Sequence, residues 1–203
     1  MLINYENIKV PKKFKYDYCV VGAGICGAII LNELKTKLSN KSICLIESGN
    51  FSIDNIHNNN LKSLTSEGLK IKKDSREFVI GGSSNTWGGL TSHFEKYEIE
   101  EIRDYLEIEN WPIKFGELRN YYNIVSKKYN FINTLNKKTE NKLFEQFNLK
   151  AFYAFQEPIN YKNYLPKDLD VIYNAHVISL FSDNRNIKKA SFTSLKTKVI
   201  SSM

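Results

Sequence analysis

An early part of the chain consists of two short apolar runs on either side of a longer segment with helical periodicity. Residues 16–22 (YDYCVVG) predict a strand, and residues 42–46 (SICLI) predict a second, as expected when both faces of a parallel sheet are covered. A strand, a helix and a strand within about thirty residues make a βαβ unit with a right-handed crossover. The helix is predicted at residues 25–38, with one apolar side formed by Ile25, Ala28, Ile29, Leu31, Leu34 and Leu38.

The remainder of the chain has a weaker pattern. A polar stretch with an Asn run follows Gly49 and predicts an irregular loop that contains His57. Helices are predicted at 116–130 and 139–148, and the first has Leu118, Tyr121, Tyr122, Val125 and Tyr129 on one face. Strands are predicted at 151–158, 170–181 and 187–195, the last two joined by a hairpin turn at 182–186. Together these elements predict an α/β fold with a Rossmann-like parallel sheet, an α+β portion and a β-hairpin.

The composition is that of a folded protein. A chain of 203 residues with 42% hydrophobic residues, 12 Tyr and 12 Phe can bury a sizeable core, which excludes a disordered chain. Apolar runs stay short of the 18–20 or so residues that a membrane-spanning helix needs. The N-terminal residues have no apolar segment of the kind found in secretory signals. We therefore expect a cytoplasmic protein without a membrane span.

Neither the charge nor the cysteines point to a further function. The net charge is +7, but the lysines are spread along the whole chain, which favours a solvated surface and no nucleic-acid partner. Cys19, Cys26 and Cys44 are odd in number and lack the C-x-x-C spacing of metal sites. We expect them to pack as small apolar side chains in strands and in the helix, and we expect no metal site.

A glycine-rich turn joins the first predicted strand to the helix. Residues 22–27 (GAGICG) match G-x-G-x-x-G, and Glu47 follows Gly27 by 20 residues, at the end of the second strand. In this pattern the first glycine allows a tight turn, Gly24 lets a pyrophosphate approach the backbone, and Gly27 lets the helix pack closely on the strand. Glu47 can accept hydrogen bonds from a ribose. The pattern predicts a dinucleotide site, and these residues leave FAD and NAD both open.

A second glycine-rich segment suggests which dinucleotide is bound. Residues 81–89 (GGSSNTWGG) resemble the flavin-contacting segment of the glucose–methanol–choline (GMC) oxidoreductases. Trp111-Pro112-Ile113, Glu117-Leu118 and Tyr121-Tyr122 resemble a further stretch of that family, and the branch with sugar oxidases and dehydrogenases is the most similar. The resemblance implies FAD as the cofactor. It implies cofactor-binding roles for Gly22, Ala23, Gly24, Ile25, Cys26, Gly27, Glu47, Ser48, Gly82, Ser83, Ser84, Asn85 and Val177.

The resemblance also implies how the flavin is held. Some sugar oxidases of this branch attach FAD covalently through a His, and Thr86 stands at the corresponding position. We therefore expect non-covalent FAD. His93 follows seven residues later, and as a lone polar His in a loop it is expected at the surface.

The family's reaction is the oxidation of a CH–OH group, here of a sugar or polyol, with hydride transfer to FAD. Its catalytic base is a His near the end of a much longer chain, and nothing in this sequence matches that segment. His57 and His176 lie in a predicted loop and a predicted strand, so we assign no catalytic residue. We expect the N-terminal portion of a GMC flavoprotein, with an incomplete sheet, little turnover alone and a remainder that could be encoded separately.

The GMC hypothesis predicts three segments: a FAD-binding segment at 1–90, a partial substrate-domain segment at 91–165, and a hairpin at 166–203 that returns to the FAD domain. Two other hypotheses about function stay open at this point. One is a non-enzymatic FAD-binding module, and the other is an NAD-binding Rossmann protein whose second glycine segment is a coincidence.

Overall fold

The computed structural model describes residues 1–53, 77–101, 111–136, 153–155 and 159–203. The chain forms two compact units, one of Met1–Thr86 with Ile159–Met203 and the other of Trp87–Pro158. Three predictions fall wholly or partly outside the described residues. They are the loop position of His57, the helix at 139–148, and the strand at 151–158 except for its residues 153–155. The two units are described separately below.

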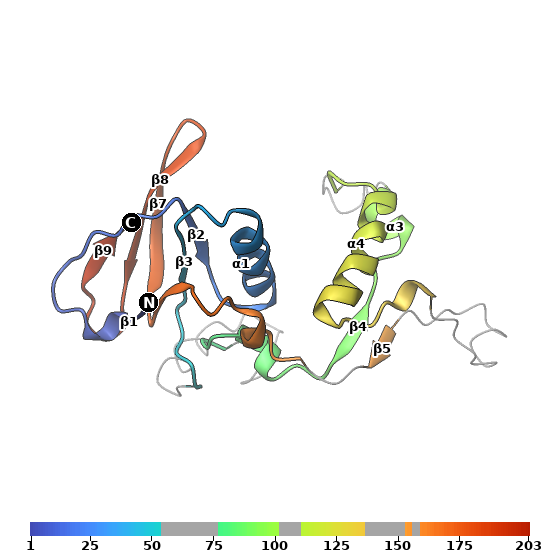
Figure 1. The fold of residues 1–203 in the computed structure, drawn as a ribbon, viewed down its shortest axis with the longest axis horizontal. Coiled ribbons are helices and arrows are strands. Elements are labelled where there is room, and N and C mark those ends of the chain that lie inside the picture. The colour runs from blue at the N-terminus through green and yellow to red at the C-terminus, as the bar shows by residue number, and fades with distance from the viewer. Residues whose placement is uncertain (54–76, 102–110, 137–152, 156–158) are drawn as a thin grey trace, which may run out of the picture. The chain divides into compact units, whose positions relative to one another are not determined.

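A four-stranded parallel sheet forms the centre of the first unit (Figure 1). Its strand order is β1-β6-β3-β2, and each neighbouring pair is parallel. The predicted βαβ unit is confirmed, and so is the α/β fold class. The elements are β1 (Leu2–Asn4), β2 (Tyr18–Val21), α1 (Ile25–Lys37), β3 (Ile43–Ile46) and β6 (Asp170–Tyr173).

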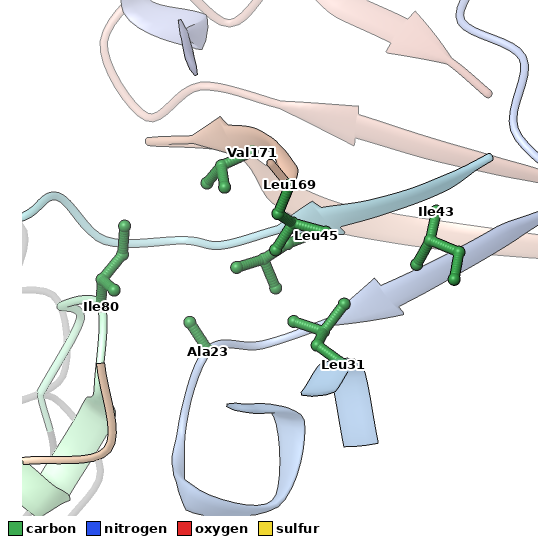
Figure 2. Close-up of a cluster of buried hydrophobic side chains, with 7 residues drawn as sticks. All are labelled: Ala23, Leu31, Ile43, Leu45, Ile80, Leu169 and Val171. Carbon is green, nitrogen blue, oxygen red and sulfur yellow. The ribbon is translucent and has the colours of Figure 1, made fainter. Parts of the chain in front are cut away.

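Both faces of β3 are covered, which explains why its sequence is apolar throughout. On one face, Leu31 of α1, Ile43 and Leu45 of β3 and Val171 of β6 belong to one cluster of buried side chains, as Figure 2 shows. On the other face a second cluster contains Tyr5, Ile8, Ile46, Ile172, Ala175 and Phe192. Complete burial of side chains of this size contributes about 1.5–3 kcal/mol each.

The second cluster joins the parallel sheet to an antiparallel sheet with the order β7-β8-β9. The predicted hairpin is confirmed, with its turn at Asn184 and Arg185. The single strand predicted at 170–181 is wrong, because Asn174 has φ +55° and the chain turns there from β6 into β7. The antiparallel strands are β7 (His176–Asp183), β8 (Asn186–Thr193) and β9 (Ile200–Ser202).

Three short 3₁₀ turns also lie among the described residues of the first unit. The 3₁₀ turn η3 (Gly82–Asn85) follows an isolated bridge between Asn50 and Val79. The 3₁₀ turn η6 (Tyr161–Tyr164) packs on α1. In addition, β1 continues into the 3₁₀ turn η1 (Tyr5–Asn7), which buries Tyr5.

The second unit contains the helix predicted at 116–130, observed as α4 (Phe115–Tyr129). Its predicted apolar face is buried only in part, since Tyr129 is buried but Tyr121 is 61% exposed. A shorter helix, α3 (Lys96–Glu100), begins with a capping box between Glu95 and Glu98. The strands β4 (Leu90–Ser92) and β5 (Tyr153–Phe155) pair antiparallel, and η5 (Thr134–Asn136) is a 3₁₀ turn.

The three cysteines differ in their exposure. Cys44 is buried as expected, but Cys19 and Cys26 are exposed, because β2 is an edge strand and Cys26 lies in the first turn of α1. Across the described residues, none of the helices combines the length and the apolar character needed to cross a membrane.

Candidate functional site

The first glycine-rich loop, residues 22–27, has the backbone geometry that its sequence suggests. Gly22 has φ +93°, a conformation that residues with a Cβ rarely adopt, and its N–H donates to Ile46 O (2.8 Å). A Cβ on Gly27 would lie 1.9 Å from Gly22 O and 3.1 Å from Gly22 C. The helix therefore packs so closely on the preceding turn that only glycine fits at position 27.

Gly24 is different, because a Cβ added there would meet no atom within 4 Å. It is the N-cap of α1, and no described side chain caps the helix through a hydrogen bond. The first turn of a helix carries unpaired N–H groups and a partial positive charge. Open space at this position can therefore admit a phosphate group.

The structure brings the two glycine-rich segments together. Gly81 N donates to Ala23 O (2.9 Å), and a Cβ on Gly82 would lie 3.2 Å from the Cα of Gly24. Gly81 and Gly82 both have positive φ, +98° and +54°. Segments almost sixty residues apart in sequence thus form one surface, and the contact favours glycine at position 82, where a Cβ would lie against the Gly24 backbone.

The side chains of η3 mostly shape the turn itself. The Ser84 hydroxyl is buried, donates to Gly81 O (2.6 Å) and accepts from Tyr161 N (3.2 Å). The Asn85 amide donates to Gly82 O (2.7 Å) and Ile80 O (3.2 Å). Ser83, in contrast, is exposed. The side chains of Ser84 and Asn85 therefore hold Gly81 and Gly82 in place.

Glu47 is 7% exposed and lies at the end of β3. One carboxylate oxygen accepts from Ala23 N (2.6 Å) and the other from Gly49 N (2.7 Å). Burial raises the pKa of Glu47, and hydrogen bonds from Ala23, Gly49 and Ser48 oppose that shift. A carboxylate has about four acceptor positions, so Glu47 can hold the glycine loop and still accept further hydrogen bonds.

Val177 and Ser48 lie near the same end of the sheet. Ala175 N donates to Glu47 O (2.9 Å), which places the start of β7 beside the end of β3. Val177 is partly buried against the cluster that contains Phe192. Ser48 is partly buried next to Glu47.

The second unit contains a feature that the sequence analysis missed. His93 was expected at the surface, but its side chain is only 6% exposed. Its Nδ1 lies 2.6 Å from Thr134 Oγ1, and its Nε2 lies 2.7 Å from Glu95 Oε1. These partners bury the ring, and the expectation was wrong because Thr134 is 41 residues away in sequence.

His93 also lines a pocket of about 420 Å³ in this unit. Its walls combine aromatic and aliphatic side chains, and part of its polar lining comes from β4, η5 and the residues next to them. The lining includes Trp87, Ser92, Tyr121, Tyr122, Phe131 and Asn133. The apolar face predicted for α4 was the signal in the sequence that could have indicated this pocket, because its Leu118, Tyr121, Tyr122 and Val125 all line it.

The sequence matches no protein-family model and no curated protein. The structure, however, is similar to solved GMC-type oxidases. A fungal aryl-alcohol oxidase has a TM-score of 0.56 at 13% identity, over 91% of this chain and 43% of that one. Pyridoxine 4-oxidase from Mesorbium loti has 0.56 at 12%, over 92% and 47%. Formate oxidase from Aspergillus oryzae RIB40 has 0.56 at 12%, over 89% and 42%.

The chain therefore spans less than half the length of each of these proteins. At such low identity the likeness concerns the fold. The parallel sheet with its helix and separate antiparallel sheet is consistent with part of the FAD-binding domain of the GMC fold.

Proposed function

We propose that this chain binds FAD non-covalently as the nucleotide-binding portion of an oxidoreductase that acts on CH–OH groups. The observation that carries the proposal is the contact between the two glycine-rich segments, Gly82 against Gly24 and Gly81 N to Ala23 O. A Rossmann loop alone is compatible with several dinucleotides. The segment that lies on this loop is the one whose sequence resembles the flavin-contacting segment of the GMC family.

The residues present fit such a cofactor. The open space at Gly24 faces the start of α1, where the pyrophosphate would bind, and Glu47 would accept from the ribose of the adenosine. The backbone of residues 82–85 and the start of β7 near Val177 would contact other parts of the dinucleotide. When bound, the flavin would accept a hydride from the carbinol carbon of the substrate. This chain's own residues would position the cofactor.

For the substrate we propose a small alcohol, with a sugar or other polyol as the class that the sequence resemblance favours. The pocket of the second unit is compatible with a ring-shaped ligand, because its Trp and Tyr side chains offer flat apolar surfaces. We assign no catalytic base to the chain. General-base catalysis contributes about 10²–10⁴ in rate, so we expect little alcohol-dependent dye reduction from these 203 residues alone.

The first experiment tests the cofactor. The purified chain is mixed with FAD, and binding is measured by visible absorbance and flavin fluorescence, with NAD as competitor. We expect saturable FAD binding that NAD does not displace. Binding of NAD in preference to FAD would support a nicotinamide-binding Rossmann protein and reject the proposal.

The second experiment tests the mode of attachment. The Thr86 hydroxyl is not expected to form a stable covalent bond with the flavin. Acid precipitation should therefore release all of the flavin into the supernatant. Yellow colour in the pellet would contradict non-covalent binding.

The third experiment separates an enzyme from a binding module. Dye reduction by sugars and simple alcohols is measured with the chain alone and with the product of the adjoining reading frame. Activity that needs both polypeptides would support a separately encoded remainder. Turnover by the chain alone would show that it carries a base that we have not assigned.

A further inference from the structure

Three sulfur atoms converge on the face of the parallel sheet that points away from α1. Cys19 of β2 and Cys44 of β3 are direct partners in the parallel register, so their side chains leave neighbouring strands side by side. Cys44 Sγ lies 3.4 Å from Met203 Sδ. The neighbouring residues Val20 and Leu45 belong to the cluster under α1, so the alternation of the strands places both cysteines on the opposite face.

Met203 is held in place by backbone hydrogen bonds. Its N–H donates to Ala190 O and its carbonyl accepts from Ala190 N, both at 3.0 Å. Its thioether is therefore presented to Cys44 by the antiparallel sheet.

Two of the three sulfur-bearing residues, Cys19 and Met203, border a pocket. A pocket of about 310 Å³ is lined by Cys19 and Met203, together with Tyr16, Asp17 and Lys189. Cys19 is exposed, whereas Cys44 is fully buried behind it. A small ion entering the pocket would meet Cys19 and Met203 first.

We propose that Cys19, Cys44 and Met203 bind one cuprous ion. Thiolate and thioether sulfurs are soft ligands and select Cu(I) among the biological metals. In a three-coordinate site with metal–sulfur bonds of about 2.3 Å, the sulfurs lie roughly 4 Å apart. Cys44 and Met203 need to separate only slightly to reach that spacing, and the flexible Met side chain permits it. Each thiol gives up one proton when the ion binds.

The donor set favours Cu(I) over zinc. Structural zinc sites take four ligands from Cys, His and carboxylates. Within the described part of the chain, no group of three or more His, Cys, Asp or Glu side chains is placed to hold a metal. Here the third donor is a thioether, which suits a soft monovalent ion.

The test is a competition for copper. The full chain, reduced and kept free of oxygen, is titrated against Cu(I) held by a coloured chelator, and the transfer of copper is followed by absorbance. We expect one Cu(I) per chain. Cys19→Ser should abolish the transfer, and Met203→Leu should weaken it by at least about tenfold, since even losing an outer-shell partner typically costs that much.

Cys26→Ser is the matched control, because it removes an exposed thiol from a different element and should leave copper binding unchanged. Circular dichroism confirms that each variant is folded. Cys44→Ala changes a buried side chain and can fail to fold. Cys19→Ser changes an exposed side chain, so it tests the site even in that case. Wild-type affinity in either Cys19→Ser or Met203→Leu, or a loss of binding in Cys26→Ser, would overturn the three-sulfur site.

Discussion

Gly24 and Gly82, one from each glycine-rich segment of the first unit, serve opposite purposes. In residues 22–27, Gly24 borders open space and the backbone of the loop faces it. In residues 81–85, glycine lets the chain approach its neighbour, and the side chains of Ser84 and Asn85 are hydrogen-bonded inward. The first segment therefore has the form of a ligand site, and the second has the form of its support. A comparison of variants in the two segments can separate binding from folding.

The largest effect is expected for Gly27→Ala. Its Cβ would overlap the Gly22 carbonyl oxygen at 1.9 Å, and a backbone atom cannot move aside cheaply. We expect a loss of about 3 kcal/mol in the free energy of unfolding, with loss of FAD binding. Urea denaturation followed by circular dichroism measures it. Gly24→Ala is the control and should cost less than about 1 kcal/mol, since its Cβ enters open space.

Gly24→Val should abolish flavin binding in a folded protein. The β-branched side chain has room in the free protein but would fill the space in front of the helix N-terminus. We expect the dissociation constant for FAD to rise roughly 100-fold or more, as measured by fluorescence titration. If the folded variant still bound FAD, the proposal that the pyrophosphate binds at this loop would be wrong.

Ser84→Ala tests the supporting segment. The change removes a donor to Gly81 O and an acceptor for Tyr161 N, both in a buried setting. Leaving buried partners unpaired should cost about 1–3 kcal/mol of unfolding free energy. Ser83→Ala, at an exposed neighbour, should stay within about 0.5 kcal/mol. Equal costs at the two positions would contradict the support role.

Glu47→Ala should weaken FAD binding by about 1–3 kcal/mol, the cost of leaving ribose hydroxyls without an acceptor. The affinity is measured by titration under conditions in which circular dichroism shows the variant to be folded. An unchanged dissociation constant would show that Glu47 does not bind the ribose. Its role would then be structural, through the hydrogen bonds that it accepts from Ala23 and Gly49.

The smallest effect concerns pH. Burial raises the pKa of Glu47 above its ordinary value of 4.5, so the native state keeps this proton to higher pH than the unfolded chain does. Its contribution to stability is complete below about pH 4.5 and is lost as the pH rises through the native pKa. Glu47→Gln cannot titrate, so its stability relative to the wild type should rise with pH across this interval. A constant difference in urea unfolding across the interval would show that the pKa is not raised.

Much of the first unit could be predicted because its signals are local. The strand at 42–46, the helix at 25–38 and the glycine loop each show their pattern within a few adjacent turns of chain. The strand β1 was missed because three residues carry no periodicity, and its only reason to be a strand is its pairing with residues 171–173. The break at Asn174 was missed for a related reason. Only the positive φ of one Asn marks the change of sheet.

The candidate site divides in the same way. The motif predicted the tight turn at Gly22 and the close packing at Gly27, because each depends on its own backbone and immediate neighbours. The inward hydrogen bonds of Ser84 depend on Tyr161, 77 residues away, and no sequence pattern encodes that distance. The burial of His93 by Thr134 is a further case.

The order of strands in the parallel sheet also determines when it can form during synthesis. β3 lies between β2, which precedes it closely, and β6, which begins about 120 residues after Ile46. Ribosomes add about 5–20 residues per second, so one edge of β3 waits roughly 6–25 s for its partner. During that time Leu45 and Ile46 are only partly covered, and they are available to chaperones or to other nascent chains. Faster translation would shorten this exposure, so the yield of folded protein should depend on the rate of elongation between β3 and β6.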